Sequence, residues 1–347
     1  MASTSFRATL RNKRAPRINW TLAISSAAAI CNVLSCRAQF GAMMASCFPR
    51  VSSRSARASS LLFACIALCG STVAQDMKIA AAELAIADRI AKSGADVGVY
   101  FRTLDGKSQW TFRADDVFHA ASTMKVPVMI ELFHQVEQGK LGLEDRLAIK
   151  NEFHSVVDDS VYALRAEDDS ELELYKAEGQ TRTLRQLCEL MIMASSNLAT
   201  NLLIEKLGVQ NIRATVHELG AQGMNVLRGV EDNKAYERGF NNTTTARGLG
   251  ILLRAIAEGK AVDALKCKEM IAILERQKFN EGIPAGLPAG TAVAHKTGEI
   301  SKIHHDAAIV FARRPFVLVI LVRGLRDIRD SSALMADISK SFYEATQ

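Results

Sequence analysis

Apolar side chains recur along this chain with more than one spacing, and the places where the spacing changes divide it into elements. Between residues 77 and 93 the apolar positions lie three and four apart, which predicts a helix. Val97–Arg102 and Gln109–Phe112 are rich in β-branched and aromatic residues, which predicts two strands. Asp105-Gly106 between them is typical of a hairpin turn. The patterned region therefore begins with a helix and a β-hairpin.

Helical spacing then dominates the middle of the chain. A helix is expected from Ser122 to about Gln138, and Pro127 is tolerated there because it lies near the helix start. Further helices are expected over Thr183–Met193, Leu198–Leu207, Gln210–Leu219, Thr243 to about Glu258, and Val262–Gln277.

The pattern returns to strands after the Pro- and Gly-rich stretch 283–290. Three strands are expected, over Ala292–Lys296, Ala307–Phe311 and Phe316–Val322. Asp330-Ser331 is expected to cap a final helix that ends near Tyr343.

Two strands, a long helical middle, three strands and a closing helix predict an α+β fold. We expect an antiparallel five-stranded sheet flanked by terminal helices, with an inserted all-helical subdomain. The sheet part would comprise about residues 77–118 and 283–347, and the helical part about 119–282. The chain enters and leaves the helical part across the sheet, so the crevice between the two parts is the expected site.

Two segments lack a clear period. Residues 151–180 are acidic, with nine Asp or Glu against Arg165 and Lys176, and we expect a solvated loop that forms a rim over the site. Residues 220–242 are rich in Gly, Asn and charge and are expected to form a long loop.

The first 74 residues differ in composition from the rest. They hold nine Arg or Lys and no Asp or Glu, and Arg54 and Arg57 precede the apolar run Leu61–Leu68. This order is typical of a secretory signal peptide, with Met43 or Met44 as an alternative start. We therefore expect a leader over 1–74, a single domain over 75–347, and export of that domain to a periplasm or to the medium. The apolar run is too short to span a bilayer, so no stable membrane anchor is expected.

The net charge and the cysteines of the chain outside the leader argue against several kinds of function. Without the nine leader residues, the 43 basic residues fall to 34 against 37 acidic ones, a net charge of −3. A nucleic-acid partner is therefore not expected. Cys188 and Cys267 are the cysteines outside the leader, and buried free thiols are favoured over a disulfide. No spacing indicates a metal site or a cofactor.

Three short motifs carry candidate chemistry. In Ser122-x-x-Lys125 the two side chains would share a helix face, and a desolvated lysine amine can take the proton of a serine hydroxyl. Ser195-x-Asn197 lies at a break between two helices, where a hydroxyl and an amide can point into a cleft. Lys296-Thr297-Gly298 offers a cation, a hydroxyl and a backbone that a ligand can approach closely. Each motif alone is common.

Together and in this order the motifs resemble Ser-x-x-Lys, Ser-Asp-Asn and Lys-Thr-Gly of class A β-lactamases and penicillin-binding proteins. The resemblance covers about residues 77–345 and is closest to the class A-like serine hydrolases. One departure is Ser196, which replaces the aspartate of Ser-Asp-Asn.

The resemblance implies a role for each matching residue in acylation. Ser122 would be the nucleophile, Lys125 its activator, and Ser195, helped by Lys296, the donor of a proton to the leaving nitrogen. Asn197 would bind the side-chain amide of the substrate, and Thr297 with Lys296 would bind its carboxylate. The Gly298-Glu299 segment would also contact the substrate. The backbone N–H groups of Ser122 and Glu299 would form the oxyanion hole.

The resemblance is weaker for deacylation. Class A enzymes hold the hydrolytic water with a loop glutamate and an asparagine four residues later. Glu231 has nearly the expected spacing and is the favoured general base, with Glu237 as an alternative, but position 235 is alanine. Asn233 could replace the missing amide.

The sequence thus predicts a secreted serine hydrolase that opens β-lactams by acylation of Ser122 and hydrolysis of the acyl-enzyme. One alternative is a D,D-peptidase or esterase with the same nucleophile, and another is a non-hydrolytic penicillin-binding sensor module. The expected partner is a small β-lactam or a peptidoglycan-like peptide, and the expected state is a monomer.

Overall fold

The computed structural model describes residues 77–347. The predicted leader lies outside the described residues. A helix over residues 77–93 opens the described part, as the apolar spacing predicted.

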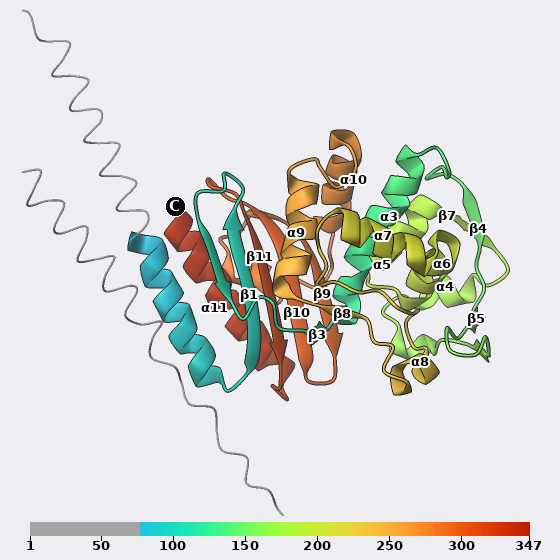
Figure 1. Ribbon diagram of the computed structural model, residues 1–347, viewed down its shortest axis with the longest axis horizontal. Coiled ribbons are helices and arrows are strands. Elements are labelled where there is room, and N and C mark those ends of the chain that lie inside the picture. The colour runs from blue at the N-terminus through green and yellow to red at the C-terminus, as the bar shows by residue number, and fades with distance from the viewer. Residues whose placement is uncertain (1–76) are drawn as a thin grey trace, which may run out of the picture. The chain divides into compact units, whose positions relative to one another are not determined.

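Five antiparallel strands form the central sheet (Figure 1). Their order is β2-β1-β11-β10-β9, and every predicted strand is confirmed. The bounds are Asp96–Thr103 for β1, Gln109–Phe112 for β2, Ala292–Ile300 for β9, Ile303–Phe311 for β10 and Phe316–Arg323 for β11.

Strand β9 continues four residues beyond the predicted end, so Lys296-Thr297-Gly298 lies inside a strand and not at its end. Thr297 faces Asp306 of β10 in the register and Gly298 faces His305. The motif residues therefore have fixed backbone positions on the edge strand of the sheet.

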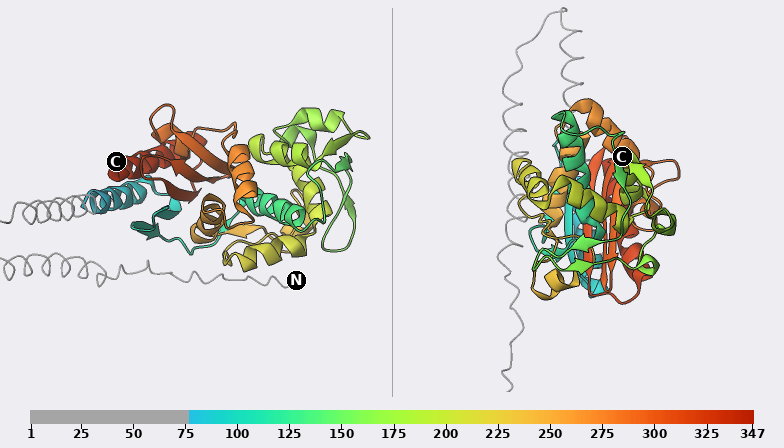
Figure 2. Two further views of the ribbon diagram at one scale, coloured as in Figure 1. Left: turned by 90° about the horizontal axis from the view of Figure 1, so that it is seen from above. Right: turned by 90° about the vertical axis from the view of Figure 1, so that its right-hand side faces the viewer.

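The two terminal helices lie side by side on one face of the sheet, as Figures 1 and 2 show. The second of them, α11, spans Ile328–Thr346. Phe342 of α11 stacks on Phe101 of β1 with ring centroids 4.0 Å apart. The side chain of Asp327 accepts a hydrogen bond from the N–H of Arg329, so Asp327 is the N-cap and the predicted cap at 330–331 is wrong.

Helix α9, Ala246–Ala257, covers the other face of the sheet and joins it to the helical part (Figure 1). A side chain at Gly250 would lie 2.3 Å from the Tyr100 ring, so the glycine permits this close approach. Thr245 is the N-cap of α9, because its Oγ1 accepts a hydrogen bond from the N–H of Gly248. Two buried apolar cores result, one on each face of the sheet.

The helical part is built around α3, most of whose residues are buried. The helices are α3 (Lys125–Glu137), α5 (Leu184–Met193), α6 (Asn197–Leu207), α7 (Val209–Glu218) and α10 (Ala264–Leu274). Short strand pairs close the loops: β3 (Phe118–His119) with β8 (Thr243–Thr244), and β4 (Arg146–Ala148) with β7 (Thr181–Thr183). The predicted α+β fold is confirmed.

The acidic segment 151–180 is not the solvated loop that its composition suggested. It contains a hairpin of β5 (Phe153–His154) and β6 (Val161–Tyr162), a 3-10 turn at Ala166–Asp168, and helix α4 (Leu172–Lys176). Elements of two to five residues are too short for a periodic pattern, and its buried residues include Leu164, Leu174 and Asp169. The loop 220–242 agrees with prediction apart from α8, Asn233–Glu237.

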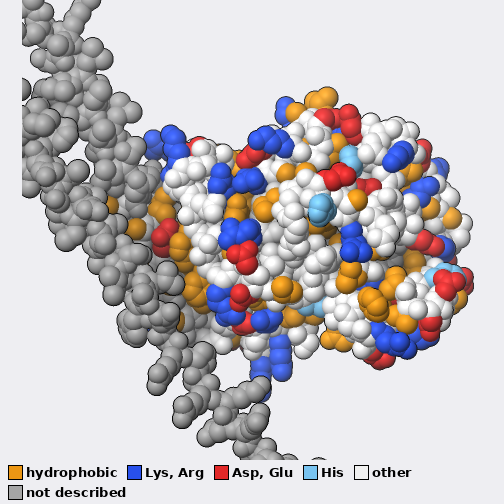
Figure 3. All heavy atoms as spheres, viewed as in Figure 1, with side chains coloured by type: hydrophobic (Ala, Val, Ile, Leu, Met, Phe, Trp, Pro, Cys, Tyr) orange, Lys and Arg blue, Asp and Glu red, His pale blue; other side chains and the backbone are white. Residues whose placement is uncertain are grey.

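Cys188 and Cys267 are both buried and unbridged, as predicted. Within residues 77–347 no helix is long and apolar enough to cross a membrane. Basic and acidic side chains are interspersed over the face seen in Figure 3.

Candidate active site

Ser122 lies in a 3-10 turn, Ala121–Met124, that leads directly into α3. Ala121 has a φ of 46°, and its N–H donates to Nδ1 of His119 over 3.1 Å. The turn buries Thr123, whose hydroxyl donates to the carbonyl of Ala120, while Ser122 is only half-buried. This turn presents the Ser122 hydroxyl to solvent at the start of the helix.

Lys125 is the first residue of α3 and is completely buried. Its Nζ donates to the carbonyl of Ser195 (2.6 Å), to Oγ of Ser195 (3.2 Å) and to Oδ1 of Asn197 (2.9 Å). Burial lowers the pKa of Lys125 to about 7, although the charges of Asp169 and Glu231 act in the opposite direction. A large fraction of this amine is therefore neutral near pH 7.

The hydroxyl of Ser195 lies between two lysines. Oγ accepts a hydrogen bond from Lys296 Nζ at 3.0 Å as well as from Lys125, and Ser195 holds a φ of 59°. Burial, together with the nearby charge of Lys125, lowers the pKa of Lys296 well below its usual range. The three groups form a connected path along which a proton can move.

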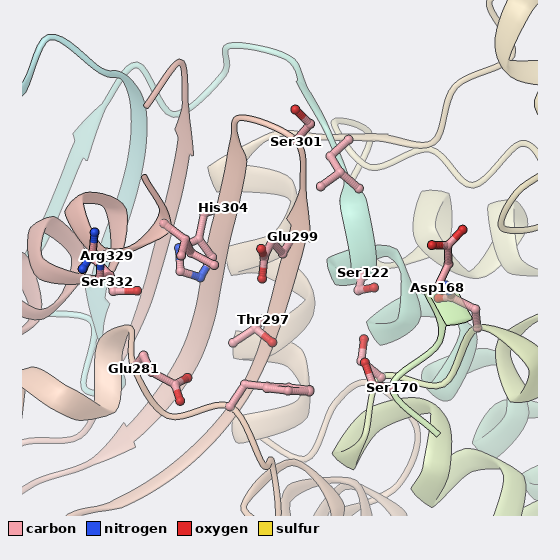
Figure 4. Close-up of a pocket in the computed structure, with 15 residues that line it drawn as sticks. Ser122, Asp168, Ser170, Glu281, Thr297, Glu299, Ser301, His304, Arg329 and Ser332 are labelled. Atoms are coloured by element: carbon pink, nitrogen blue, oxygen red, sulfur yellow. The ribbon is translucent and has the colours of Figure 1, made fainter. Parts of the chain in front are cut away.

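Gly298 of β9 packs against the turn that bears Ser122. A Cβ at Gly298 would lie 3.0 Å from the backbone nitrogens of both Ser122 and Thr123. Only glycine therefore allows β9 to pack against the 3-10 turn without displacement. Thr297 and Glu299 on either side of Gly298 point into the cavity (Figure 4).

A cavity of about 670 Å³, here called the substrate cavity, opens in front of Ser122. Figure 4 shows that Ser122 and Asp168 enter it from the helical part, whereas Thr297 and Glu299 enter from β9. Ser195 and Asn197 line it as well. The predicted crevice between the two parts therefore exists. Ser122 and Ser195 line it, and the buried Lys125 and Lys296 contact it through Ser195 Oγ.

Glu231 reaches the same region from the loop 220–242. Its Oε1 accepts from Nδ2 of Asn197 (3.3 Å) and its Oε2 from the N–H of Arg165 (3.2 Å). Burial raises the pKa of Glu231, and the charges of Asp168 and Asp169 raise it further. Glu231 has a φ of 60°, and it shares with Ser122 a second cavity of about 470 Å³, here called the Glu231 cavity.

Glu237 and Asn233, the other residues considered for deacylation, lack the contacts that Glu231 makes in the site. Glu237 is exposed at the end of α8 and lines neither of these two cavities. Asn233 lines the Glu231 cavity, but no hydrogen bond joins it to Glu231 in the described part of the chain. Of the two glutamates considered for deacylation, Glu231 is therefore the one that lines a cavity together with Ser122.

A residue that the sequence did not single out fixes the Glu231 loop. Oδ1 of Asn201 on α6 accepts from the N–H of Val230 (2.6 Å), and its Nδ2 donates to the Val230 carbonyl (2.9 Å). Asn201 lies four residues after Asn197, so both amides project from one face of α6 toward the loop. That spacing was the one signal available in the sequence.

Strand β10 carries His304, His305 and Asp306 directly after its first residue, Ile303. All three side chains are buried. His305 Nε2 donates to the carbonyl of His119 (2.9 Å) and Nδ1 accepts from the N–H of Val322 (3.1 Å). His305 thus supports the turn before Ser122. Residues 77–347 contain no group of three ligands suited to a metal ion.

Comparisons with known proteins agree with this arrangement. Residues 81–346 match the model of the beta-lactamase enzyme family. A beta-lactamase of Bacteroides uniformis is 24% identical over 302 residues, which cover 82% of this chain and 96% of that protein.

Two solved structures illustrate the structural likeness. A beta-lactamase from Sphaerobacter thermophilus is 26% identical, with a TM-score of 0.64 over 75% of this chain and 95% of its own. A mutant of PBP-A, solved as an acyl-enzyme complex with penicillin G, is also 26% identical, with a TM-score of 0.66 over 77% of this chain and 96% of its own.

Proposed function

The chain belongs to the beta-lactamase enzyme family, and from this premise we propose that it opens β-lactam rings by acylation of Ser122 and then hydrolyses the acyl-enzyme. The observation that carries the proposal is that Ser122 and Ser195 line one cavity, while two buried lysines, Lys125 and Lys296, both donate to Ser195 Oγ.

Acylation begins with removal of the Ser122 proton. The buried amine of Lys125 has a pKa of about 7 and is therefore a competent base at neutral pH. No hydrogen bond joins Lys125 to Ser122 within the described residues, and such bonds commonly tighten only when substrate binds. Ser195 then donates its proton to the leaving ring nitrogen as the C–N bond breaks, and Lys125 returns the proton taken from Ser122 to Ser195 Oγ through their hydrogen bond. Lys296 hydrogen-bonds the same hydroxyl and helps to hold it.

The developing oxyanion is placed between Ser122 and β9. The close approach at Gly298 supports a pair of donors from the N–H groups of Ser122 and Glu299. Thr297 lines the cavity beside Lys296, so a substrate carboxylate would bind there. Asn197 would hold the side-chain amide of the substrate.

Deacylation needs a base that activates water. Glu231 is half-buried, shares the Glu231 cavity with Ser122, and has a raised pKa that brings its carboxylate closer to the basicity this step requires. Both oxygens already accept a hydrogen bond, which orients the carboxylate toward Asn197.

Intact-mass spectrometry after mixing with penicillin G tests the proposal. The wild-type protein should gain the mass of one penicillin and return to its original mass, with continued turnover of the drug. Ser122→Ala should show neither change, whereas the control Ser341→Ala on α11 should behave as the wild type. A wild-type protein that neither gains mass nor consumes the penicillin would overturn the proposal.

A D,D-peptidase or esterase with the same nucleophile is the second candidate. The observation that favours it is that both Glu231 oxygens are already hydrogen-bonded, which leaves fewer lone pairs to orient water. In that case the penicillin adduct would persist and a D-Ala-D-Ala peptide would be cleaved. Under the first proposal Glu231→Gln converts a short-lived adduct into a persistent one; under the second, the adduct lifetime is the same in both proteins.

Export is proposed from the leader alone. Nine basic residues, no acidic ones and the apolar run Leu61–Leu68 support a cleaved signal peptide and a periplasmic or secreted product. Expression of the full chain in a bacterium, followed by fractionation and N-terminal sequencing, tests this. Uncleaved protein in the cytoplasm would contradict it.

A further inference from the structure

Asp169 lies in the acidic segment 151–180 and is buried against the start of α6. Its Oδ2 accepts hydrogen bonds from the backbone N–H groups of Asn197 (2.8 Å) and Leu198 (2.9 Å). The hydroxyls of Ser196 (3.3 Å) and Tyr175 (3.0 Å) donate to the same oxygen. One carboxylate oxygen thus has four donors around it.

These contacts complete the N-terminus of α6. The first N–H groups of a helix have no partner within the helix and carry partial positive charge. Ser196 Oγ accepts from the N–H of Ala199, so Asp169 satisfies the two N–H groups that precede it. The related motif Ser-Asp-Asn has an aspartate where this chain has Ser196. Here the carboxylate at the helix start comes from a different segment.

The same stretch also contacts the deacylation side of the site. The N–H of Arg165, four residues before Asp169, donates to Glu231. Asn197, whose N–H is held by Asp169, contacts both Lys125 and Glu231 through its side chain. Residues 165–169 therefore touch the groups proposed for both chemical steps.

Charge provides a second connection to Lys125. Two carboxylates act on this amine, Asp169 from the acidic segment and Glu231 from its loop, and Lys125 in turn lowers the pKa of Lys296 on β9. Asp169 favours the protonated amine, against the burial that lowers the pKa of Lys125 to about 7.

We propose that Asp169 is a positioning residue of the acylation machinery: it fixes the start of α6 so that Ser195 and Asn197 hold Lys125. The negative charge of Asp169 also favours the protonated amine of Lys125. The inference rests on the proposed function in taking Lys125 as the base. The segment 151–180 then contributes a residue to the active site, in addition to covering its edge.

The test compares Asp169→Asn with the matched control Glu173→Gln, an exposed carboxylate of the same segment. Asparagine keeps an oxygen acceptor for the α6 N–H groups but removes the charge. We expect Asp169→Asn to slow penicillin acylation about tenfold or more and to move the acid limb of the acylation rate to lower pH. Glu173→Gln should change neither quantity.

A substrate-independent readout separates this inference from the proposed function. The ¹³Cε signal of Lys125, assigned by its loss in Lys125→Met, can be titrated by NMR in the wild type and in Asp169→Asn. We expect its midpoint to fall by about one pH unit in the variant. An unchanged midpoint overturns the inference. If the wild type is never acylated, the proposed function fails, while the titration still decides the role of Asp169.

Discussion

At the scale of single residues, the site depends on two lysine amines and a serine hydroxyl that hydrogen-bond one another away from water. Lys125 and Lys296 are fully buried, and each donates to Ser195 Oγ. Two ammonium groups this close repel each other in a medium of low dielectric constant, so full protonation of both is disfavoured. The neutral amine that a serine hydrolase needs therefore follows from burial and proximity.

The first residue-scale prediction concerns pH. Lys125 can accept the Ser122 proton only when neutral, and its pKa is about 7. The acylation rate constant divided by the penicillin dissociation constant should therefore fall tenfold per pH unit below about pH 7. Stopped-flow measurements between pH 5 and 9 check this. A rate that stays flat from pH 5 to 7 would exclude Lys125 as the base.

The second concerns Gly298. Because a Cβ there would crowd the backbone nitrogens of Ser122 and Thr123, Gly298→Ala should push β9 away and widen the oxyanion hole. We expect acylation to slow about 100-fold, the usual effect of losing one such donor. The rate of penicillin labelling measures it. Ser341→Ala on α11 is the control and should label at the wild-type rate.

At the scale of elements, α6 is the part on which both chemical steps depend. Its first residue, Asn197, contacts Lys125 and Glu231, and one turn later Asn201 holds the backbone of Val230. Spacing of four along a helix places both amides on the same face. Any change that rotates α6 would therefore disturb acylation and deacylation together, whereas a change at Asn201 should affect the second step.

Asn201→Leu tests this separation. Leucine keeps the volume but leaves the N–H and carbonyl of Val230 without partners, so the backbone that carries Glu231 should shift. We expect the lifetime of the penicillin adduct to be at least tenfold longer in Asn201→Leu than in the wild type. The rate at which the adduct forms should change less than about threefold. Time-resolved mass spectrometry gives both rates, with Asn211→Leu on α7 as the control. Equal slowing of both steps would refute the separate role.

The elements also show why sequence reasoning succeeded in some places and failed in others. Ser122, Ser195 and Lys296 were predictable because each lies in a short motif whose neighbours belong to long, periodic elements. Asp169 was not, because it lies between elements of three and five residues and its partners are backbone N–H groups, which leave no trace in the sequence. The geometry around Glu231 was equally hidden, because it depends on the loop backbone.

At the scale of the whole molecule, buried polar side chains connect the sheet to the turn that bears Ser122. His305 is fully buried on β10 and hydrogen-bonds both the carbonyl of His119 and the N–H of Val322 on β11. Burial lowers the pKa of His305 to about 4. Folding therefore requires the neutral imidazole, and stability is coupled to pH through this residue.

The sign of this coupling gives a prediction. His305 is charged in the unfolded chain below about pH 6.5, but in the folded chain only below about pH 4. Its contribution is complete above pH 6.5 and is lost as pH falls toward 4, by about 3 kcal/mol in total. Urea denaturation at several pH values measures it. In His305→Gln, whose side chain can make both hydrogen bonds but does not titrate, the free energy of unfolding should fall less steeply between pH 6.5 and 4. If the free energies of unfolding of the wild type and the variant run parallel over this range, His305 is not the group responsible.

Three residues of the site, Ala121, Ser195 and Glu231, adopt left-handed backbone conformations without being glycine. Such conformations typically cost about 1 kcal/mol or more each, which together is a substantial part of the 5–15 kcal/mol that stabilises a typical domain. A laboratory selection for heat resistance alone would therefore favour glycine at these positions, and at Ser195 and Glu231 that exchange would also remove the functional side chain. Libraries for improved thermostability should leave these three codons unchanged and search the two cores instead.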